Sequence, residues 1–242
     1  MVNKLTYLLL QVRNPQDPMR RQEVDAFARA LHCTPRQIEV VDMLTDAPTA
    51  DRLRRVDVVL LGGSGDYSAT GQGSWLDRTL DSLRELERTA KPTFASCWGF
   101  QAMARALGGE VAHDLPRAEL GTIELFLTDE GLADPVFAPL GRTFRGQAGH
   151  EDHVVRIPPG AVLLASSAAV QNQAYRLLGK PIYCTQFHPE LNRNDLLGRL
   201  RAYPRYVERI AGISFEEFGE RCEDTPQTEA LLRRFVRQTF GE

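Results

Sequence analysis

Short apolar runs alternate with amphipathic stretches along the first part of the chain. A run of consecutive apolar residues favours a buried strand, whereas apolar residues three and four apart favour one face of a helix. The predicted strands are residues 4–12, 37–43 and 54–61, and the predicted helices are residues 19–31 and 75–89. The third strand is apolar on both faces from Val56 onward, which is typical of a central parallel strand. The alternation predicts a doubly wound, mainly parallel α/β sheet with helices on both faces.

Beyond Gly109 the pattern changes to short β-like runs separated by Asp-Pro, Pro-Leu-Gly and Pro-Pro-Gly turns. These runs are residues 110–113, 121–128, 143–150, 154–157 and 162–166. We expect them to form antiparallel strands and hairpins that extend the main sheet. Residues 174–178 and 182–187, on either side of Gly179-Lys180-Pro181, form the last predicted hairpin.

A single cysteine stands at a sharp turn that the pattern predicts within residues 91–109. Strand-favouring residues precede Cys97, and good helix formers follow it as far as Leu107. Ala95 and Gly99, two positions to either side of the cysteine, are small enough to let strand and helix approach closely. This arrangement predicts a nucleophile elbow.

An elbow of this kind favours catalysis by its cysteine. At a helix N-terminus, unpaired N–H groups and the helix dipole stabilise a thiolate, and the N–H of Trp98 is a natural donor to an oxyanion. The alternative is that Cys97 is a buried small hydrophobic residue, as most free cysteines are. The elbow alone leaves both interpretations open.

A cysteine nucleophile needs a base that takes its proton. The strand predicted at residues 182–187 leads into a histidine that can serve as this base and a glutamate that can orient it. His188 and Glu190 are two residues apart, so in an extended segment they share one side, and Pro189 stiffens the backbone between them. The order predicts Cys97 as nucleophile, His188 as general base and then acid, and Glu190 as the group that holds the imidazole tautomer.

The two segments together resemble the signatures of class I glutamine amidotransferases. Residues 95–101, Ala-Ser-Cys-Trp-Gly-Phe-Gln, are similar to the family's G-x-C-x-G-x-Q elbow, and residues 186–190 match its Q-F-H-P-E strand end. Ala95 stands where the family usually has glycine, which keeps a small residue there. The resemblance covers about residues 1–192. It implies a three-layer, flavodoxin-like α/β domain with extra antiparallel strands, and a role for Gln101 in positioning the glutamine.

A glycine-rich turn, residues 62–68, follows the third predicted strand. Alone it is an ordinary tight turn, and no Gly-Lys-Ser/Thr follows that would make it a phosphate loop. It is similar to the family's G-G-P-G-type loop, with Ser64 in place of the common proline. The resemblance implies that the Gly63 N–H is the second oxyanion donor and that Gly65 lies near the substrate.

Residues 147–153 are the densest polar cluster that contains histidines. Imidazoles and carboxylates bind metals, but His150 and His153 fit no strong zinc signature, and no metal site is predicted. A polar loop is the simplest alternative. The resemblance offers another, because the family often carries an S-H-x-D-x-V-like segment here. It implies that the backbone near Ala148 and Gly149 contacts the α-amino acid end of the substrate.

The remaining histidines and cysteines have no such context. His32 and His113 are expected to be structural or surface residues. Cys33, Cys184 and Cys222 are interpreted as packing residues, with Cys184 close to the site because it lies in the histidine strand.

Composition bounds the class of protein. The chain has 242 residues, 43% hydrophobic and 25% charged, enough for one large core. Four cysteines without close pairing and no signal peptide favour the reducing cytoplasm. No apolar run approaches the ~18 residues of a membrane span. A net charge of −3 gives no general attraction to nucleic acid or to anionic membranes.

Residues 193–242 lie beyond the resemblance, and we predict a helical extension packed on the same domain. Five arginines are interleaved with two tyrosines: Arg193, Arg199, Arg201, Arg205 and Arg209 with Tyr203 and Tyr206. Such a series can bind RNA, but glutamates follow closely, so a solvated helical face is predicted. Asp224 and Gln227 predict a capping box for a last helix, residues 225–240, that docks its apolar face on the body. The extension either modifies an interface or covers the site.

The predicted reaction is cleavage of a γ-glutamyl amide, in L-glutamine or another γ-glutamyl compound, through a cysteine thioester and without a cofactor. Because the chain has no room for a synthetase domain, either the ammonia passes to a separate synthetase subunit or the protein is a free-standing γ-glutamyl hydrolase. A cysteine peptidase or small-amide hydrolase with another acyl group is a further alternative. A catalytically silent binding or regulatory module is the last, and the three residues Cys97, His188 and Glu190 argue against it.

Overall fold

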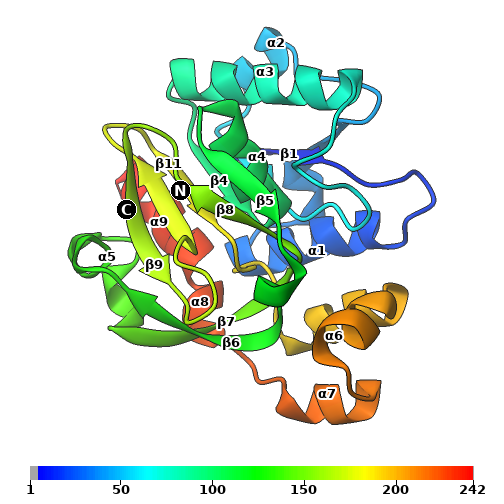
Figure 1. Ribbon diagram of the computed structural model, residues 1–242. Coiled ribbons are helices and arrows are strands. Elements are labelled where there is room, and N and C mark those ends of the chain that lie inside the picture. Colours follow the sequence, from blue (N-terminus) through cyan, green and yellow to red (C-terminus); the bar gives the residue numbers. More distant parts are fainter. Residues whose placement is uncertain (1–4, 242) are drawn as a thin grey trace.

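The computed structural model describes residues 5–241, so the start of the first predicted strand, at Lys4, lies outside the described residues. A nine-stranded mixed sheet occupies the centre, in the order β2-β1-β3-β4-β11-β10-β9-β6-β7 (Figure 1). The parallel strands are β1 (Tyr7–Gln11), β2 (Ile38–Asp42), β3 (Val58–Leu61), β4 (Thr93–Ser96) and β11 (Ile182–Thr185). The antiparallel strands are β6 (Glu119–Leu127), β7 (Thr143–His150), β9 (Ala161–Ser166) and β10 (Ala174–Leu177). The predicted mainly parallel sheet with antiparallel additions is confirmed.

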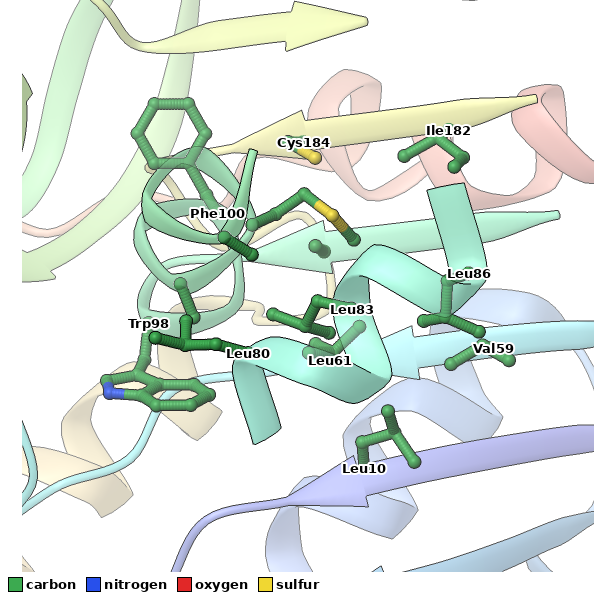
Figure 2. Packing of buried hydrophobic residues seen from close by; sticks show 14 of the residues in the cluster. Leu10, Val59, Leu61, Leu80, Leu83, Leu86, Trp98, Phe100, Ile182 and Cys184 are labelled. Atoms are coloured by element: carbon green, nitrogen blue, oxygen red, sulfur yellow. The ribbon is translucent and has the colours of Figure 1, made fainter. Parts of the chain in front are cut away.

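Helices cover both faces of this sheet. On one face lie α3 (Ser74–Arg88) and α4 (Trp98–Ala106), and on the other lie α1 (Met19–Leu31) and α9 (Leu231–Phe240). Side chains of β1 alternate between the two, so Leu8 and Leu10 join the core under α3, while Tyr7 and Leu9 join the core under α1. Figure 2 shows the first core, in which leucines of α3 lie over strands β1 and β3. The sheet is therefore buried on both sides, as the apolar runs predict.

Smaller elements complete the chain. β5 (Glu110–His113) and β8 (Asp152–Arg156) form a separate antiparallel pair. The short helical segments are η2 (Pro35–Gln37), η3 (Leu115–Arg117), α5 (Asp129–Ala133) and η4 (Ala138–Leu140).

The predicted third strand begins too early. Arg54 and Arg55 belong to a short helix, α2 (Ala50–Arg55), and β3 begins only at Val58. The Thr49 side chain accepts a hydrogen bond from the N–H of Arg52 and so caps this helix. This local cap fixes the segment as a helix, which a pattern based on apolar runs does not detect.

The extension forms α6 (Arg193–Ala202), a π-helical turn η5 (Val207–Ala211), α7 (Phe215–Arg221), α8 (Pro226–Glu229) and α9. In Figure 1, α6 (orange) lies beside α1 and α7 lies beyond α6, and apolar residues of α6 and α7 form one buried cluster with Ala26 of α1. The helix predicted at residues 225–240 begins at Pro226, but its predicted capping box is absent and the helix is interrupted at Ala230. Asp224 accepts from the N–H of Arg193 instead of capping a helix, and Ala230 separates two helices. The docking of α9 is confirmed, because Leu231 and Phe235 are fully buried.

Candidate active site

Cys97 occupies a strained turn between β4 and α4. Its backbone has φ 51° and ψ −108°, a conformation that residues other than glycine rarely adopt. Three hydrogen bonds fix the turn: Cys97 N–H donates to Thr185 O over 2.8 Å, Gln101 N–H donates to Cys97 O over 3.1 Å, and Gly99 N–H donates to Gly62 O over 3.1 Å. The neighbouring strand ends β3 and β11 therefore hold the elbow in place.

Small residues are required where strand and helix meet. A Cβ atom on Gly99 would lie 2.5 Å from Leu61 Cβ and 3.3 Å from Ala95 Cβ. Any larger side chain would force α4 away from the sheet and move the cysteine with it. The close packing predicted from Ala95 and Gly99 is present.

A buried histidine–glutamate pair lies beside the elbow. The His188 backbone N–H donates to Gln147 O over 2.8 Å, and His188 Nδ1 lies 2.7 Å from Glu190 Oε1. His188 is 4% exposed, Glu190 is fully buried, and the imidazole interacts with the side chain of Cys97. With its Nδ1–H directed at Glu190, the neutral imidazole keeps Nε2 as a proton acceptor.

The charges of this pair support each other. Burial alone lowers the pKa of His188, but the charges of Glu190 and Cys97 outweigh it and raise that pKa to about 9. Burial alone raises the pKa of Glu190, but His188, with a contribution from Arg199, lowers it to about 2. The glutamate is therefore ionised at neutral pH, and an imidazolium beside it is strongly stabilised.

The raised pKa of His188 links the stability of the fold to pH. Because the folded protein holds this proton more tightly than the unfolded chain, whose ordinary value is 6.5, the group stabilises the fold below that pH. The contribution is lost as the pH rises through about 9. We expect the free energy of unfolding of the wild type, relative to His188→Gln, to fall by about 3 kcal/mol over this window.

Urea denaturation of both proteins at about pH 6 and at about pH 9.5, on either side of the two pKa values, measures this change. The H188Q protein serves as the baseline for all other titrating groups. A stability difference that does not change with pH would show that no imidazolium is stabilised at this position.

Gly63 and Trp98 both line a cavity that Cys97 and His188 also line. Neither the Gly63 N–H nor the Trp98 N–H donates a hydrogen bond to another atom of residues 5–241. A Cβ atom on Gly63 would lie 3.2 Å from His188 Cε1, so the glycine-rich loop passes directly over the imidazole. This is the arrangement expected of a pair of oxyanion donors.

The glutamine amidotransferase class-I family matches residues 21–196 of the chain. This chain belongs to that family. A glutamine-hydrolysing GMP synthase subunit of Ignicoccus hospitalis is 32% identical over 123 residues, which cover 50% of this chain and 63% of that protein. The chain thus spans less than two thirds of the length of that relative. γ-Glutamyl peptidase 3 of Arabidopsis thaliana is 24% identical over 188 residues, 75% of this chain and 71% of that protein.

A solved structure has the same fold. The crystal structure of a glutamine amidotransferase from Thermotoga maritima superimposes with a TM-score of 0.76 at 18% identity and covers 98% of both chains. The flavodoxin-like amidotransferase fold implied by the sequence is confirmed, and family membership supports a glutamine amidohydrolase activity.

A cavity of about 290 Å³ opens above the cysteine. Gly63, Gly65, Gln101 and Gly149 line it, whereas Ala148 is fully buried in β7 and does not line it. The Cys97 thiol lies 3.7 Å from the Gly149 carbonyl oxygen. Of Ala148 and Gly149, the two residues predicted near the substrate, only Gly149 lines the cavity, and the contact itself stays a prediction.

Gln101 and Gly65 lie at fixed positions on this cavity. The amide Nε2 of Gln101 donates to Asp152 O over 2.8 Å and to Gln186 Oε1 over 3.1 Å, which leaves its own oxygen as an acceptor. Gly65 has φ 74°, and a Cβ atom there would come within 2.7 Å of the Tyr203 hydroxyl. The glycine-rich loop thus needs glycine at this position for its backbone and for the close approach of Tyr203, which follows α6.

The polar histidine cluster is held internally. His150 contacts Asp152 O through Nδ1 at 3.0 Å and Glu119 through Nε2 at 3.1 Å, and His113 Nδ1 lies 2.8 Å from Asp152 Oδ1 at the cavity edge. Within residues 5–241, no group of three His, Cys, Asp or Glu side chains could hold a metal ion.

Cys184 is buried, and burial raises its pKa to about 12. No helix in the described part of the chain is long and apolar enough to cross a membrane.

The prediction of a solvated arginine face on the extension is wrong for Arg199. This residue is 6% exposed and lies against His188 and Glu190, and Tyr203 and Tyr206 of the following turn also line the cavity. The signal was present in the spacing, because Arg199 shares a helical face with Leu196, Leu200 and Tyr203. Arg13, also missed, follows shortly after the buried strand β1 at the functional edge of the sheet.

Proposed function

We propose that this chain hydrolyses the γ-amide of L-glutamine or of another γ-glutamyl compound through a thioester on Cys97. The observation that carries the proposal is the buried His188–Glu190 pair beside a strained cysteine at the floor of a cavity. A carboxylate-held imidazole can take the thiol proton through Nε2, and the thiolate is the nucleophile.

The proposed reaction has two halves. The Cys97 thiolate attacks the amide carbon, and the oxyanion that forms is held by the N–H groups of Gly63 and Trp98. His188 gives its proton to the departing amine, which leaves a γ-glutamyl thioester. The imidazole then removes a proton from water, the water oxygen attacks the thioester, and glutamate and the free thiol are released with the proton returned to sulfur.

The residues that line the cavity support an assignment of the substrate contacts. The free oxygen of Gln101 and the carbonyl of Gly149 can accept hydrogen bonds from the α-ammonium group, and the backbone of Gly65 borders the amide. These assignments place the acyl part of the substrate between α4 and β7.

The departing amine can have one of two fates, transfer to a synthetase subunit or release by a free-standing hydrolase. The Ignicoccus relative is named as a subunit of a synthase, which supports ammonia transfer from this chain to a separate synthetase subunit. One observation favours a free-standing γ-glutamyl hydrolase instead. Tyr203 and Tyr206, with Arg205, line the cavity from the extension, so part of the surface above the thiol is already covered by the chain itself.

Intact-protein mass spectrometry after incubation with 6-diazo-5-oxo-norleucine, an electrophile that mimics glutamine, tests the proposal. We expect one adduct on the wild type, located at Cys97 by peptide mapping, and none on Cys97→Ala. Protection by excess L-glutamine but not by D-glutamine would support a γ-glutamyl pocket. If Cys97 reacts with iodoacetamide but not with this reagent, the thiol is still a reactive nucleophile, but the cavity does not bind a γ-glutamyl group as proposed.

A further inference from the structure

Arg199 of α6 places a buried positive charge next to the proposed catalytic pair. Its Nη1 lies 3.4 Å from His188 Nδ1 and 3.6 Å from Glu190 Oε1. Only 6% of the residue is exposed. The extension thus reaches the centre of the site with a charged group, although the family match ends at residue 196.

The guanidinium and the imidazole compete for one oxygen. Glu190 Oε1 lies within reach of both, while Glu190 Oε2 and Arg199 Nη2 have no hydrogen-bond partner among residues 5–241. Because Arg199 has only donors and His188 Nδ1 carries the proton directed at Glu190, the two nitrogens at 3.4 Å cannot hydrogen-bond each other. When the imidazole becomes an imidazolium, two positive charges face each other across this distance.

Contacts on the far side hold the guanidinium independently of the pair. Arg199 Nε donates to Gln22 Oε1 over 3.0 Å, and Nη2 lies 3.9 Å from Glu23 Oε1. Glu23 is in turn held by Arg13 at 3.1 Å. Arg13 also pairs with Asp17 at 3.1 Å, so the two arginines are paired with carboxylates on this side, and the position of Arg199 is set by α1 as well as by Glu190.

We propose that Arg199 is a positioning residue that tunes how tightly His188 holds its proton; this inference rests on the proposed function. It keeps Glu190 ionised and oriented, and it opposes the imidazolium that Glu190 and Cys97 stabilise. Without this opposition the imidazolium is a weaker acid and returns its proton less readily to the departing amine.

The test is the titration of His188 followed by NMR in protein labelled with ¹⁵N-histidine, with the signal assigned through His188→Gln. The groups that face the imidazole are Cys97, Glu190 and Arg199, and behind them lie Arg13, Glu23 and Asp17. We expect Arg199→Met to move the titration to higher pH by about one unit or more, because a like charge is removed. Arg199→Lys keeps the charge and should titrate close to the wild type.

Arg201→Met is the matched control, because Arg201 lies on the exposed side of the same helix, 5.0 Å above the Phe215 ring. It should leave the His188 titration unchanged. A folded R199M protein in which His188 titrates as in the wild type, or at lower pH, would overturn the proposal. If R199M does not fold, Arg199→Gln, which removes the same charge but keeps a polar side chain, should show the same upward shift; an unshifted titration there overturns the proposal equally.

The NMR measurement needs no substrate. A wild type that hydrolyses neither L-glutamine nor a γ-glutamyl dipeptide and forms no adduct on Cys97, together with a shifted R199M titration, would refute the proposed function and leave the role of Arg199 intact. An active wild type with an unshifted R199M titration would support the proposed function and overturn the role proposed for Arg199.

Discussion

Cys97→Ser is expected to lower kcat/KM for the hydrolysis of L-glutamine by at least about 10⁴-fold, because a hydroxyl at the elbow is a far weaker nucleophile than a thiolate. The substitution keeps the size of the side chain and the strained backbone of the turn, so the cavity and the His188–Glu190 pair stay in place. Glutamate release measured with a coupled glutamate dehydrogenase assay gives the rates.

Cys33→Ser is the control for this prediction. Cys33 is half-buried after the C-terminal end of α1, and burial raises its pKa to about 11, so it is a neutral thiol at physiological pH. Its replacement should leave the rate within about twofold of the wild type, as expected for a residue outside the site. A C97S protein that keeps more than about a tenth of the activity would place the nucleophile elsewhere.

Local sequence was sufficient to predict the elements that carry the chemistry. Cys97 sits between a strand-forming and a helix-forming segment with small residues on both sides, and the structure has the elbow there. The helix predicted at residues 19–31 has these bounds in the structure. Such features depend on neighbours in the chain, which a pattern of residues records directly.

Features that depend on distant contacts were not predicted. The burial of Arg199 requires Glu190 on one side and Glu23 of α1 on the other, and no local pattern reports a partner so far away in the chain. A charged residue on a helix is usually solvated, so the basic series was assigned to the surface. The competing evidence was the apolar face that Arg199 shares with Leu196 and Leu200, both buried.

The extension changes how the site is understood. A minimal glutaminase domain would leave the cavity bordered by the ends of strands, whereas here α6 and the residues after it add Arg199, Tyr203 and Tyr206 to its wall. Tyr206 donates to Gly65 O over 2.9 Å, and Arg205 pairs with Asp66 at 2.6 Å. The extension and the glycine-rich loop are therefore joined by polar contacts among residues that line the cavity. The predicted division at residue 192 stays a prediction, but the chemistry we propose uses both sides of it.

Glu190→Gln is expected to lower kcat for L-glutamine by about 10³- to 10⁴-fold with little change in KM. In the wild type, Glu190 Oε1 lies 2.7 Å from His188 Nδ1 and 3.6 Å from Arg199 Nη1. The amide introduced by this substitution can keep an oxygen in the Oε1 position, but it carries no negative charge. The imidazolium that forms when His188 takes the proton of Cys97 therefore loses the carboxylate that stabilises it.

The same substitution should also lower the pKa of His188 from about 9, because the charge of Glu190 that helps to raise it is gone. Glu124→Gln, at an exposed position on β6, is the matched control and should change neither quantity. An E190Q protein within about tenfold of wild-type kcat would mean that the reaction does not need the charge of the carboxylate. In that case the double variant E190Q/R199M, compared with the two single variants in a mutant cycle, would show how strongly the two charges are coupled.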